Sequence, residues 1–321
     1  MENNKTIIID TLGSDKGPEA ILDGAKLVLE ENDDIHLTIV GDEELIKSKD
    51  LPLDRIKIIN CNKTVTNLDN PVEAFYHKEK ASIFLALEEA SKDENAIGVI
   101  SSGSTGAVLV GTLRYLLDEN RTRPALSAIL PTTTKGAFTC LVDTGASIDC
   151  SPTQLVQFAH QGTDFMRKLY KIESPRVGLL SNGSEPTKGN KLVKETYKLL
   201  EKEEGINFVG NVEGSAALNN LCDVLVCDGF AGNQVLKNSA GMAVNLITEI
   251  IKYGKKTGNE EITKQIAGYL MSTYDFESLG AGIMLGARKL VLKCRGSSGA
   301  MAIKNAAKII INVSSNKTVY E

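Results

Sequence analysis

The sequence predicts an α/β fold, with a doubly wound and mostly parallel sheet covered by helices on both faces. Short apolar runs are followed repeatedly by a Gly, Ser or Asp turn and then by an amphipathic helix, which is the pattern of parallel βαβ units. The composition, 42% hydrophobic and 24% charged, is ordinary for a packed globular chain. No low-complexity linker or internal repeat divides the chain, so we expect a single α/β domain over residues 1–321.

The expected strands are short apolar runs bounded by turn residues. They are Thr6–Ile9, Leu37–Val40, Ile56–Ile59, Gly98–Ser101, Phe138–Val142, Val177–Leu180, Val224–Cys227 and Leu290–Leu292. The expected helices lie between them and repeat apolar residues at helical spacing. They are Glu19–Glu31, Ile83–Ser91, Gly106–Leu117, Pro152–Arg167, Lys191–Glu203, Val235–Lys255 and Met301–Ile311.

One stretch departs from the alternation of strands and helices. Residues 245–276 carry two helical segments with a Gly-containing break at residues 253–259 and no strand between them. This predicts a helical hairpin that protrudes from the sheet. Its apolar residues recur at helical spacing, which fits core, a dimer interface or a membrane contact. Lys252, Lys255, Lys256 and Lys264 make its tip basic.

Composition excludes several classes of function. No run approaches the ~18 apolar residues of a membrane span, and the first residues lead into a strand, so we expect a cytoplasmic protein. The net charge of −5 argues against general binding of nucleic acid. The six cysteines and three histidines lack metal-ligand spacing. We expect reduced, mostly buried thiols, no metal and no cofactor.

Ligands in open parallel sheets bind where the strands end and helices begin. The loops at these positions are polar and rich in glycine: residues 10–15, 101–106, 143–147, 182–190 and 228–233. Each loop alone is explained as well by ordinary turn chemistry. Together they hold four aspartates and one lysine, which indicates a ligand site.

The loop Ser102–Gly106 is the best predicted anion site, because small residues, hydroxyls and a helix N-terminus suit phosphate oxygens. It lacks the Gly-Lys-Ser/Thr ending of a nucleotide triphosphate loop. Lys188 fits either a solvated loop lysine or a phosphate ligand, and Asn233 fits either a helix cap or an oxyanion donor. The sequence alone does not decide between the two roles of Lys188 or between the two roles of Asn233.

No covalent nucleophile is apparent. The chain has no Gly-x-Ser-x-Gly elbow, and His160 lies within a predicted helix. Cys140 and Cys150 have no cationic neighbour in sequence that would activate a thiolate. The pattern therefore favours chemistry by positioning and electrostatics.

These loops, in this combination and order, resemble the PlsX family, the acyl-carrier-protein:phosphate acyltransferases of bacterial phospholipid synthesis. The resemblance covers essentially the whole chain. The matching stretches are Glu19–Gly24, Ser102–Ala107, Arg123–Ala125, Asp143–Ala146, Leu155–Ala159, Ser174–Leu180, Lys188–Asn190, Ile206–Glu213, Asp228–Phe230, Gly232–Asn233 and Gly296–Ser298.

The resemblance implies a fold like that of isocitrate and isopropylmalate dehydrogenases and of phosphotransacetylases. It also implies a homodimer without metal, an acyl carrier protein or other thioester as acyl donor, inorganic phosphate as acceptor, and peripheral contact of the hairpin with anionic membrane. Lys188 and Asn233 fall on the family's catalytic positions. The expected phosphate- and substrate-binding residues are Asp10, Gly13, Asp15, Ser102, Gly103, Ser104, Thr105, Gly106, Arg123, Asp143, Asn190, Asp228 and Gly229.

The chain departs from the family pattern near this site. Ser14, Ser104 and Ser147 replace a usual glycine and two asparagines, Arg295 replaces a histidine, and residues 279–282 differ from the usual Tyr-Gly-Gly-Ala. Two alternatives stay open. One is a PlsX-like paralogue that makes a short-chain acyl phosphate, as in a glycine-reductase-type subunit; the other is a non-catalytic phosphate- or acyl-binding regulator. A metal bound by the four aspartates is a further alternative.

The expected mechanism uses binding geometry. Ser102–Gly106 and Lys188 hold phosphate against the thioester carbonyl, and Asn233 donates to the oxyanion. The aspartates orient these donors.

Overall fold

The computed structural model describes residues 5–118, 122–274, 276 and 281–315. By internal contacts the chain forms two compact units. Unit 1 comprises residues 1–126, 168–171 and 280–321, and unit 2 comprises residues 127–167 and 172–279. The expected single domain over residues 1–321 stays a prediction, because compactness does not show whether the units fold independently.

The strands of unit 1 are mostly parallel, in the order β3-β2-β1-β4-β11-β10. Their bounds are β1 Lys5–Asp10, β2 Ile35–Gly41, β3 Ile56–Asn60, β4 Ala96–Ser101, β10 Gly282–Leu285 and β11 Leu290–Lys293. The pair β10 and β11 is antiparallel, and the other described pairs are parallel. Ile7, Ile8 and Ile9 of β1 are fully buried, as expected for a strand covered on both faces.

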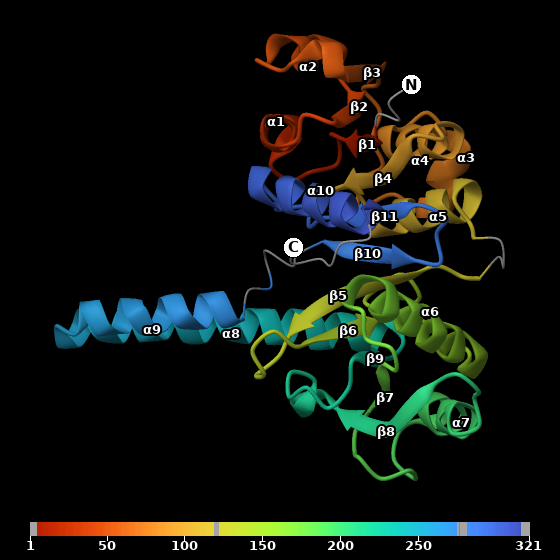
Figure 1. The fold of residues 1–321 in the computed structure, drawn as a ribbon, viewed down its shortest axis with the longest axis vertical. Helices are drawn as coiled ribbons and strands as arrows, with labels where there is room; N and C mark the ends of the chain where they lie inside the picture. The colour runs from red at the N-terminus through yellow and green to blue at the C-terminus, as the bar shows by residue number, and fades with distance from the viewer. Residues whose placement is uncertain (1–4, 119–121, 275, 277–280, 316–321) are drawn as a thin grey trace. The chain divides into compact units, whose positions relative to one another are not determined.

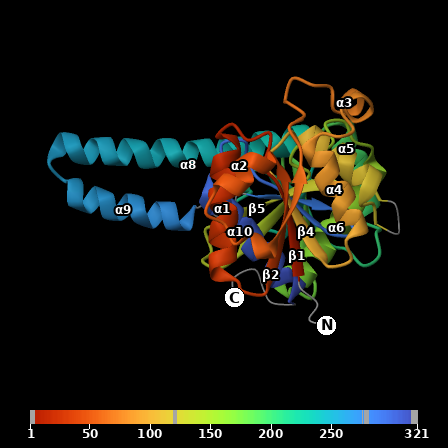
Figure 2. The same cartoon turned by 90° about the horizontal axis from the view of Figure 1, so that it is seen from above.

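Helices cover both faces of the unit 1 strands, with α1 and α10 on one side and α4 and α5 on the other (Figure 2). Their bounds are α1 Gly17–Glu31, α2 Glu43–Ser48, α3 Pro71–His77, α4 Ser82–Lys92, α5 Thr105–Tyr115 and α10 Ala300–Ser314, with a 3₁₀ turn at Leu53–Arg55. A Cβ on Gly24 would lie 2.6 Å from Ile303 Cβ. This glycine therefore lets α1 pack directly on α10.

Unit 2 has the strand order β5-β6-β9-β7-β8, in which only the described pair β5 and β6 is antiparallel. The strands are β5 Ala125–Pro131, β6 Phe138–Val142, β7 Arg176–Ser181, β8 Asn207–Glu213 and β9 Val224–Val226. The helices are α6 Pro152–Tyr170, α7 Lys191–Leu200, α8 Gly229–Thr257 and α9 Glu260–Thr273, with a 3₁₀ turn at Gly214–Ala216. Gly162 lets α6 approach β9, because a Cβ there would lie 2.5 Å from Val224.

The helices α8 and α9 form an antiparallel hairpin that projects from unit 2 (Figures 1 and 2). The first half of α8, from Ala231 to Ala243, packs on the unit 2 core. Gly258 ends α8 in the left-handed conformation, with φ of 72°, as is common for a glycine after a helix. None of the described helices is long and apolar enough to span a membrane.

The structure confirms the predicted fold class, and each predicted strand coincides with an observed one to within two residues at either end. Three strands were not predicted. β8 is exposed at alternate positions and contains Gly210 with φ of 97°, and β10 has four residues. β5 is buried throughout but lacks the alternation that marks a strand. The α8 helix also begins earlier than the predicted Val235, at Gly229.

Candidate active site

The predicted site residues fall into two groups, one in each unit. In unit 1 they follow β1 and β4 or precede β5: Asp10, Gly13, Asp15, Ser102, Gly103, Ser104, Thr105, Gly106 and Arg123. In unit 2 they follow β6, β7 and β9: Asp143, Lys188, Asn190, Asp228, Gly229 and Asn233.

In unit 1, Asp10 links the loops that follow β1 and β4, which we call the first loop pair (residues 10–15 and 101–106). Its carboxylate accepts the Leu12 N–H at 3.2 Å and the Ser101 hydroxyl at 2.7 Å. The Ser101 hydroxyl oxygen accepts the Gly103 N–H at 3.0 Å. Burial raises the pKa of Asp10 to about 6, although the hydrogen bond from the Ser101 hydroxyl acts against this rise.

The first loop pair is closely packed around glycines. Gly13 has φ of 86°, and a Cβ there would lie 2.9 Å from Gly103 Cα. A Cβ on Gly106 would lie 2.6 Å from the Pro71 ring, so α3 rests on the start of α5. Close backbone approach of this kind is what a phosphate loop requires.

The other unit 1 residues have simpler surroundings. Ser104 is the N-cap residue of α5 but makes no side-chain cap bond, and Thr105 begins the helix. Ser102 is 2% exposed, and its hydroxyl has no hydrogen-bond partner among the described residues. Asp15 donates its N–H to the Gly296 carbonyl at 2.9 Å. Arg123 is exposed, two residues before β5.

In unit 2, Asp143 organises the loop after β6. Its carboxylate accepts the N–H groups of Gly145 and Ala146 at 3.2 Å and of Ser147 at 2.6 Å. This loop packs against the start of α8, because Gly229 donates its N–H to the Ser147 carbonyl at 2.7 Å. We call residues 143–147 together with residues 228–233, the N-cap and first turn of α8, the second loop pair.

Asn233 belongs to this second loop pair through a side-chain contact. Its amide nitrogen donates to the Thr144 carbonyl at 2.9 Å. A Cβ on Gly232 would lie 1.9 Å from the Asp143 carbonyl oxygen, so only glycine permits this approach. An amide nitrogen carries two N–H donors. One N–H of Asn233 thus fixes the side chain, and the other makes no hydrogen bond among the described residues.

Asp228 and Asn190 are helix caps as well as candidate ligands. The Asp228 carboxylate accepts the Ala231 N–H at 2.8 Å at the start of α8. The Asn190 amide oxygen accepts the Val193 N–H at 2.9 Å at the start of α7. Asp228 therefore caps the N-terminus of α8 and Asn190 caps the N-terminus of α7.

Lys188 lies on the exposed loop just before Asn190. Its ammonium is 4.0 Å from the Glu185 carboxylate, and both side chains are about half exposed. Such an exposed pair holds a lysine weakly. The ammonium is therefore able to move to an incoming anion.

A pocket of about 570 Å³ in unit 2 gathers several of these loops. Its polar lining includes Ser181, Asn182, Asn190 and Asp228. Its apolar lining consists of Leu155, Leu179, Leu180, Val193, Ala231 and Val235, with Gly189, Gly214 and Cys227. The buried Ser181 hydroxyl has no partner among the described residues. An apolar wall with a few polar groups suits an acyl chain with a polar end.

The sequence did not single out Ser181 or the apolar residues of this pocket. Ser181 is the last residue of β7. Its position directly before the predicted loop 182–190 could have marked it as a site residue. The apolar residues come from α6, β7, α7 and α8. These residues come together only when the four elements pack, and the hydrophobic pattern of the sequence does not predict that packing.

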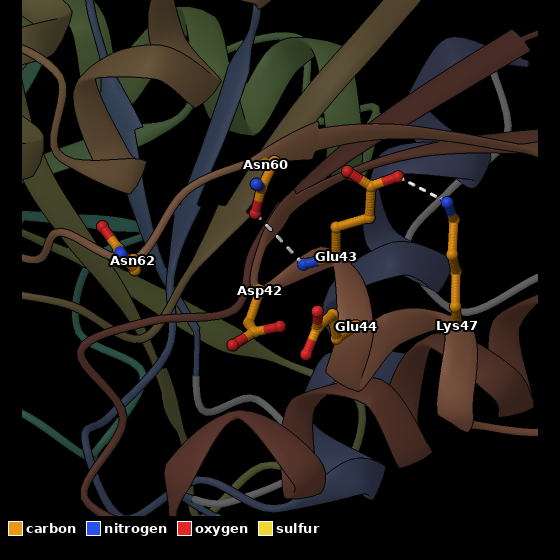
Figure 3. Close-up of a pocket in the computed structure, with 6 residues that line it drawn as sticks. All are labelled: Asp42, Glu43, Glu44, Lys47, Asn60 and Asn62. Carbon is orange, nitrogen blue, oxygen red and sulfur yellow. Dashed lines mark hydrogen bonds and ion pairs between the residues drawn. The ribbon is translucent and has the colours of Figure 1, made fainter.

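A second pocket, of about 410 Å³, lies in unit 1 at the ends of β2 and β3. Figure 3 shows its lining residues Asp42, Glu43, Glu44, Lys47, Asn60 and Asn62. Glu43 pairs with Lys47 and donates its N–H to the Asn60 side chain at 3.2 Å. Carboxylates outnumber the one cation, so the pocket repels phosphate, and none of the predicted site residues lines it.

The described thiols are poorly suited to act as nucleophiles. All six cysteines are free and five are buried. Burial raises the pKa of Cys140, of Cys222 and of Cys294 to about 12. The thiolate is the reactive form of cysteine. Among the described residues, no three His, Cys, Asp or Glu side chains gather as a metal site.

Solved structures share this fold at low sequence identity. A phosphotransacetylase from Streptococcus pyogenes is 17% identical with a TM-score of 0.61, covering 98% of this chain and 95% of that one. The EutD phosphotransacetylase from Staphylococcus aureus is 15% identical with a TM-score of 0.58, at the same coverage. The chain thus has the α/β fold of phosphotransacetylases. The expected likeness to the dehydrogenases stays a prediction.

Sequence relatives define the family. A phosphate acyltransferase of Halothermothrix orenii is 38% identical over 318 residues, covering 94% of this chain and 93% of that protein. One of Clostridium acetobutylicum is 37% identical over 322 residues, covering 98% and 96%. The family described as "Fatty acid synthesis protein" matches residues 5–319. The chain belongs to this family, the PlsX family that its sequence motifs resemble.

Proposed function

We propose that the protein is a phosphate acyltransferase that transfers a fatty acyl group from acyl carrier protein to inorganic phosphate, giving an acyl phosphate for phospholipid synthesis. The unit 2 pocket carries this proposal, since apolar residues line it beside Asn190 and Asp228. The names of the relatives support the same reaction. We propose that it works in the cytoplasm.

The reaction balances without a cofactor. An oxygen of HPO₄²⁻ attacks the thioester carbonyl carbon, the C–S bond of the resulting tetrahedral intermediate breaks, and the thiolate leaves. The proton lost by the phosphate ends on the sulfur. A thiol is a good leaving group, with an ordinary pKa of ~8.5. The protein therefore contributes mainly positioning and stabilisation of charge.

Two unit 2 residues have the chemistry for these tasks. The Lys188 ammonium, weakly held by Glu185, attracts the phosphate dianion. The Asn233 amide, held by the Thr144 carbonyl, donates its second N–H to the oxyanion of the tetrahedral intermediate. Asp143 shapes the loop against which Asn233 lies, and so acts as a positioning residue.

The test is acyl phosphate formation, trapped with hydroxylamine, for the variants Lys188→Ala and Asn233→Ala. Each removes an interaction worth ~2–4 kcal/mol in the transition state, so we expect turnover to fall by about two to three orders of magnitude. Lys191→Ala is the matched control, because Lys191 is a neighbouring lysine with an 88% exposed side chain. Wild-type turnover by both site variants would remove these residues from the mechanism.

A panel of donors tests the acyl group and its carrier. Fatty acyl carrier protein should be used better than fatty acyl coenzyme A, and both better than acetyl coenzyme A. A preference for the acetyl donor would favour the short-chain alternative. Failure of every donor to yield acyl phosphate would favour the non-catalytic binding protein.

The hairpin is the proposed surface for a second copy and for anionic membrane. Several of its large apolar residues are exposed, among them Leu246 at 56%, Ile262 at 58% and Tyr269 at 69%, so these three are not core of this chain. Lys255 and Lys256 make no ion pair among the described residues. A basic tip attracts anionic lipid over a range that salt screens to ~10 Å.

We expect salt-sensitive sedimentation with anionic vesicles, and loss of it when Lys252, Lys255 and Lys256 all become Glu. The control changes Lys191, Lys194 and Lys198 of α7 to Glu, which alters the net charge equally on another exposed helix. Equal binding by both triple variants would contradict the basic-tip proposal. Sedimentation equilibrium of the same proteins tests the homodimer separately.

A further inference from the structure

The unit 2 pocket has one wall that is wholly apolar. Ala231 and Val235 of α8 line the pocket, and residues four apart lie on the same side of a helix. Both pack on the core cluster that contains Leu180, a third lining residue. Gly214 also lines the pocket and adjoins them, because a Cβ there would lie 3.7 Å from Val235 and 4.0 Å from Leu180. We call these four residues the α8 wall.

The other side of the pocket faces α6 and carries a polar group. A Cβ on Gly162 of α6 would lie 2.5 Å from Val224, which is in register with Val177 of β7. Because alternate residues of a strand share a face, Leu179 and Ser181 also face α6. Both line the pocket, and the Ser181 hydroxyl is buried without a partner among the described residues. The α8 wall is therefore the more apolar side of the pocket.

The charge of the lining disfavours phosphate inside this pocket. Asp228 is the only charged residue among the described lining residues, and its carboxylate caps α8. Like charges repel more strongly where water is displaced, so a phosphate dianion is poorly held here. The Lys188 ammonium lies on the adjoining loop, one residue before Gly189, which lines the pocket. The pocket is therefore left for an uncharged part of the substrate.

We propose that the α8 wall binds the first carbons of the acyl chain and thereby determines which acyl groups the protein accepts. The inference rests on the proposed phosphate acyltransferase function. The chain lies along Ala231 and Val235, which are about one helical turn, ~6 Å, apart. Its carbonyl end lies toward Asn190, next to the loop of Lys188. Each methylene that leaves water for this wall strengthens binding roughly fourfold, whereas an acetyl group has no methylene and gains nothing.

Gly214→Ala takes room from the pocket without straining the chain. The backbone of Gly214 lies outside the left-handed region, and its new Cβ would meet Val235 at 3.7 Å, an ordinary contact distance. We expect kcat/KM for octanoyl coenzyme A to fall about four- to tenfold, and kcat/KM for acetyl coenzyme A to change less than about twofold. Gly241→Ala is the matched control, because a Cβ on Gly241 of α8 would meet no described atom within 4 Å.

Ala231→Leu fills the same wall more completely. We expect this variant to lose the preference for octanoyl over acetyl coenzyme A, because the larger side chain occupies the place of the acyl chain. Ala243→Leu is the matched control. Ala243 lies on the same helix and packs on the same core cluster, but it is not one of the described lining residues. Circular dichroism checks that both variants fold, and Gly214→Ala decides the matter if Ala231→Leu does not.

The comparison of the two donors identifies what lies on the wall. Both carry the same pantetheine arm and differ only in the acyl group. A loss confined to the octanoyl donor in Gly214→Ala and Ala231→Leu supports the proposal. An equal loss with both donors would place the pantetheine arm on the wall and would overturn the assignment to the acyl chain. An unchanged ratio of the two kcat/KM values in both variants would overturn it as well.

Binding without phosphate separates this inference from the proposed function. In isothermal titration calorimetry the wild type should bind octanoyl coenzyme A more tightly than acetyl coenzyme A, with a more negative heat capacity change because more apolar surface is buried. If Gly214→Ala loses that difference but the wild type forms no acyl phosphate, the proposed function is wrong and the wall assignment stands. If acyl phosphate forms and every variant keeps the wild-type preference between donors, the function stands and the wall assignment is wrong.

Discussion

In both loop pairs an aspartate helps to hold two adjacent segments together, but the hydrogen bonds that do so differ. In the first loop pair of unit 1, Asp10 reaches across to the Ser101 hydroxyl of the neighbouring loop. In the second loop pair of unit 2, the Asp143 carboxylate is surrounded by three N–H groups of its own loop, and the backbone and Asn233 join the two loops. The Asp143 carboxylate is thus the acceptor at the centre of one loop, whereas the Asp10 carboxylate bridges two loops.

This difference predicts unequal responses to the same substitution. In Asp143→Asn the new amide N–H₂ group faces backbone N–H groups and cannot accept hydrogen bonds from them. We therefore expect the unfolding free energy to fall by about 3 kcal/mol. Asp10→Asn keeps one oxygen for the Leu12 N–H, and Ser101 can reverse its hydrogen bond. We expect a change within about 1 kcal/mol at neutral pH. Urea unfolding followed by circular dichroism measures both, and equal losses would show that the two carboxylates are equivalent.

Glycine substitutions probe how closely each loop pair is packed. Gly13→Ala forces a left-handed residue, and its Cβ would meet the Gly103 backbone at 2.9 Å, so we expect a cost of about 2 to 3 kcal/mol. Gly145→Ala is strained too, but its Cβ would meet only the Asn233 amide, at 3.2 Å. A side chain can move aside, so we expect a cost of about 1 to 2 kcal/mol.

The same two variants separate packing from activity. Gly145→Ala should lower acyl phosphate formation more than stability, because it disturbs Asn233. Gly13→Ala should act mainly on stability and on the KM for orthophosphate. The reverse order of the two unfolding free energies would show that the second loop pair is the more tightly packed.

The sequence predicted the loops after β1, β4 and β6, because turn residues after apolar runs mark strand ends. The predicted loop 228–233 is instead the N-cap and first turn of α8, which begins at Gly229. The sequence did not predict how the loops are tied together. The bond from Asp10 to Ser101 joins residues 91 positions apart, and the bond from Asn233 to Thr144 joins residues 89 apart. Such contacts depend on which strands are neighbours in the sheet. The hydrophobic pattern of a sequence predicts helices and strands but not the order of the strands.

Lys293 shows the same limit most clearly. The strand Leu290–Leu292 was predicted, and Lys293 is the next residue, yet nothing local distinguishes it from a strand-end lysine on the surface. Only the pairing of β4 with β11 shows that Lys293 lies in register with Ser101. The roles of Lys188, Asn233 and the predicted binding residues stay predictions, since the structure gives their surroundings and not their chemistry.

The smallest expected effect is the dependence of stability on pH, and it tests whether burial raises the pKa of Asp10 in the first loop pair. The pKa of Asp10 is raised by burial from 3.8 to about 6 in the folded chain. The folded state therefore binds a proton more tightly than the unfolded state between these values. The resulting stabilisation is complete below pH 3.8 and is lost as the pH rises through about 6.

Between pH 5 and pH 7.5 this group alone should lower the unfolding free energy of the wild type by about 1 kcal/mol, because most of its proton is lost in that window. Asn does not titrate, so the stability difference between Asp10→Asn and the wild type should grow by the same amount over this range. Lys293 and Asp15 also face this region; repeating the comparison in Lys293→Gln should steepen the slope, since the cation that favours ionised Asp10 is gone. A pH-independent difference would mean that Asp10 stays charged in the folded chain and that burial does not raise its pKa.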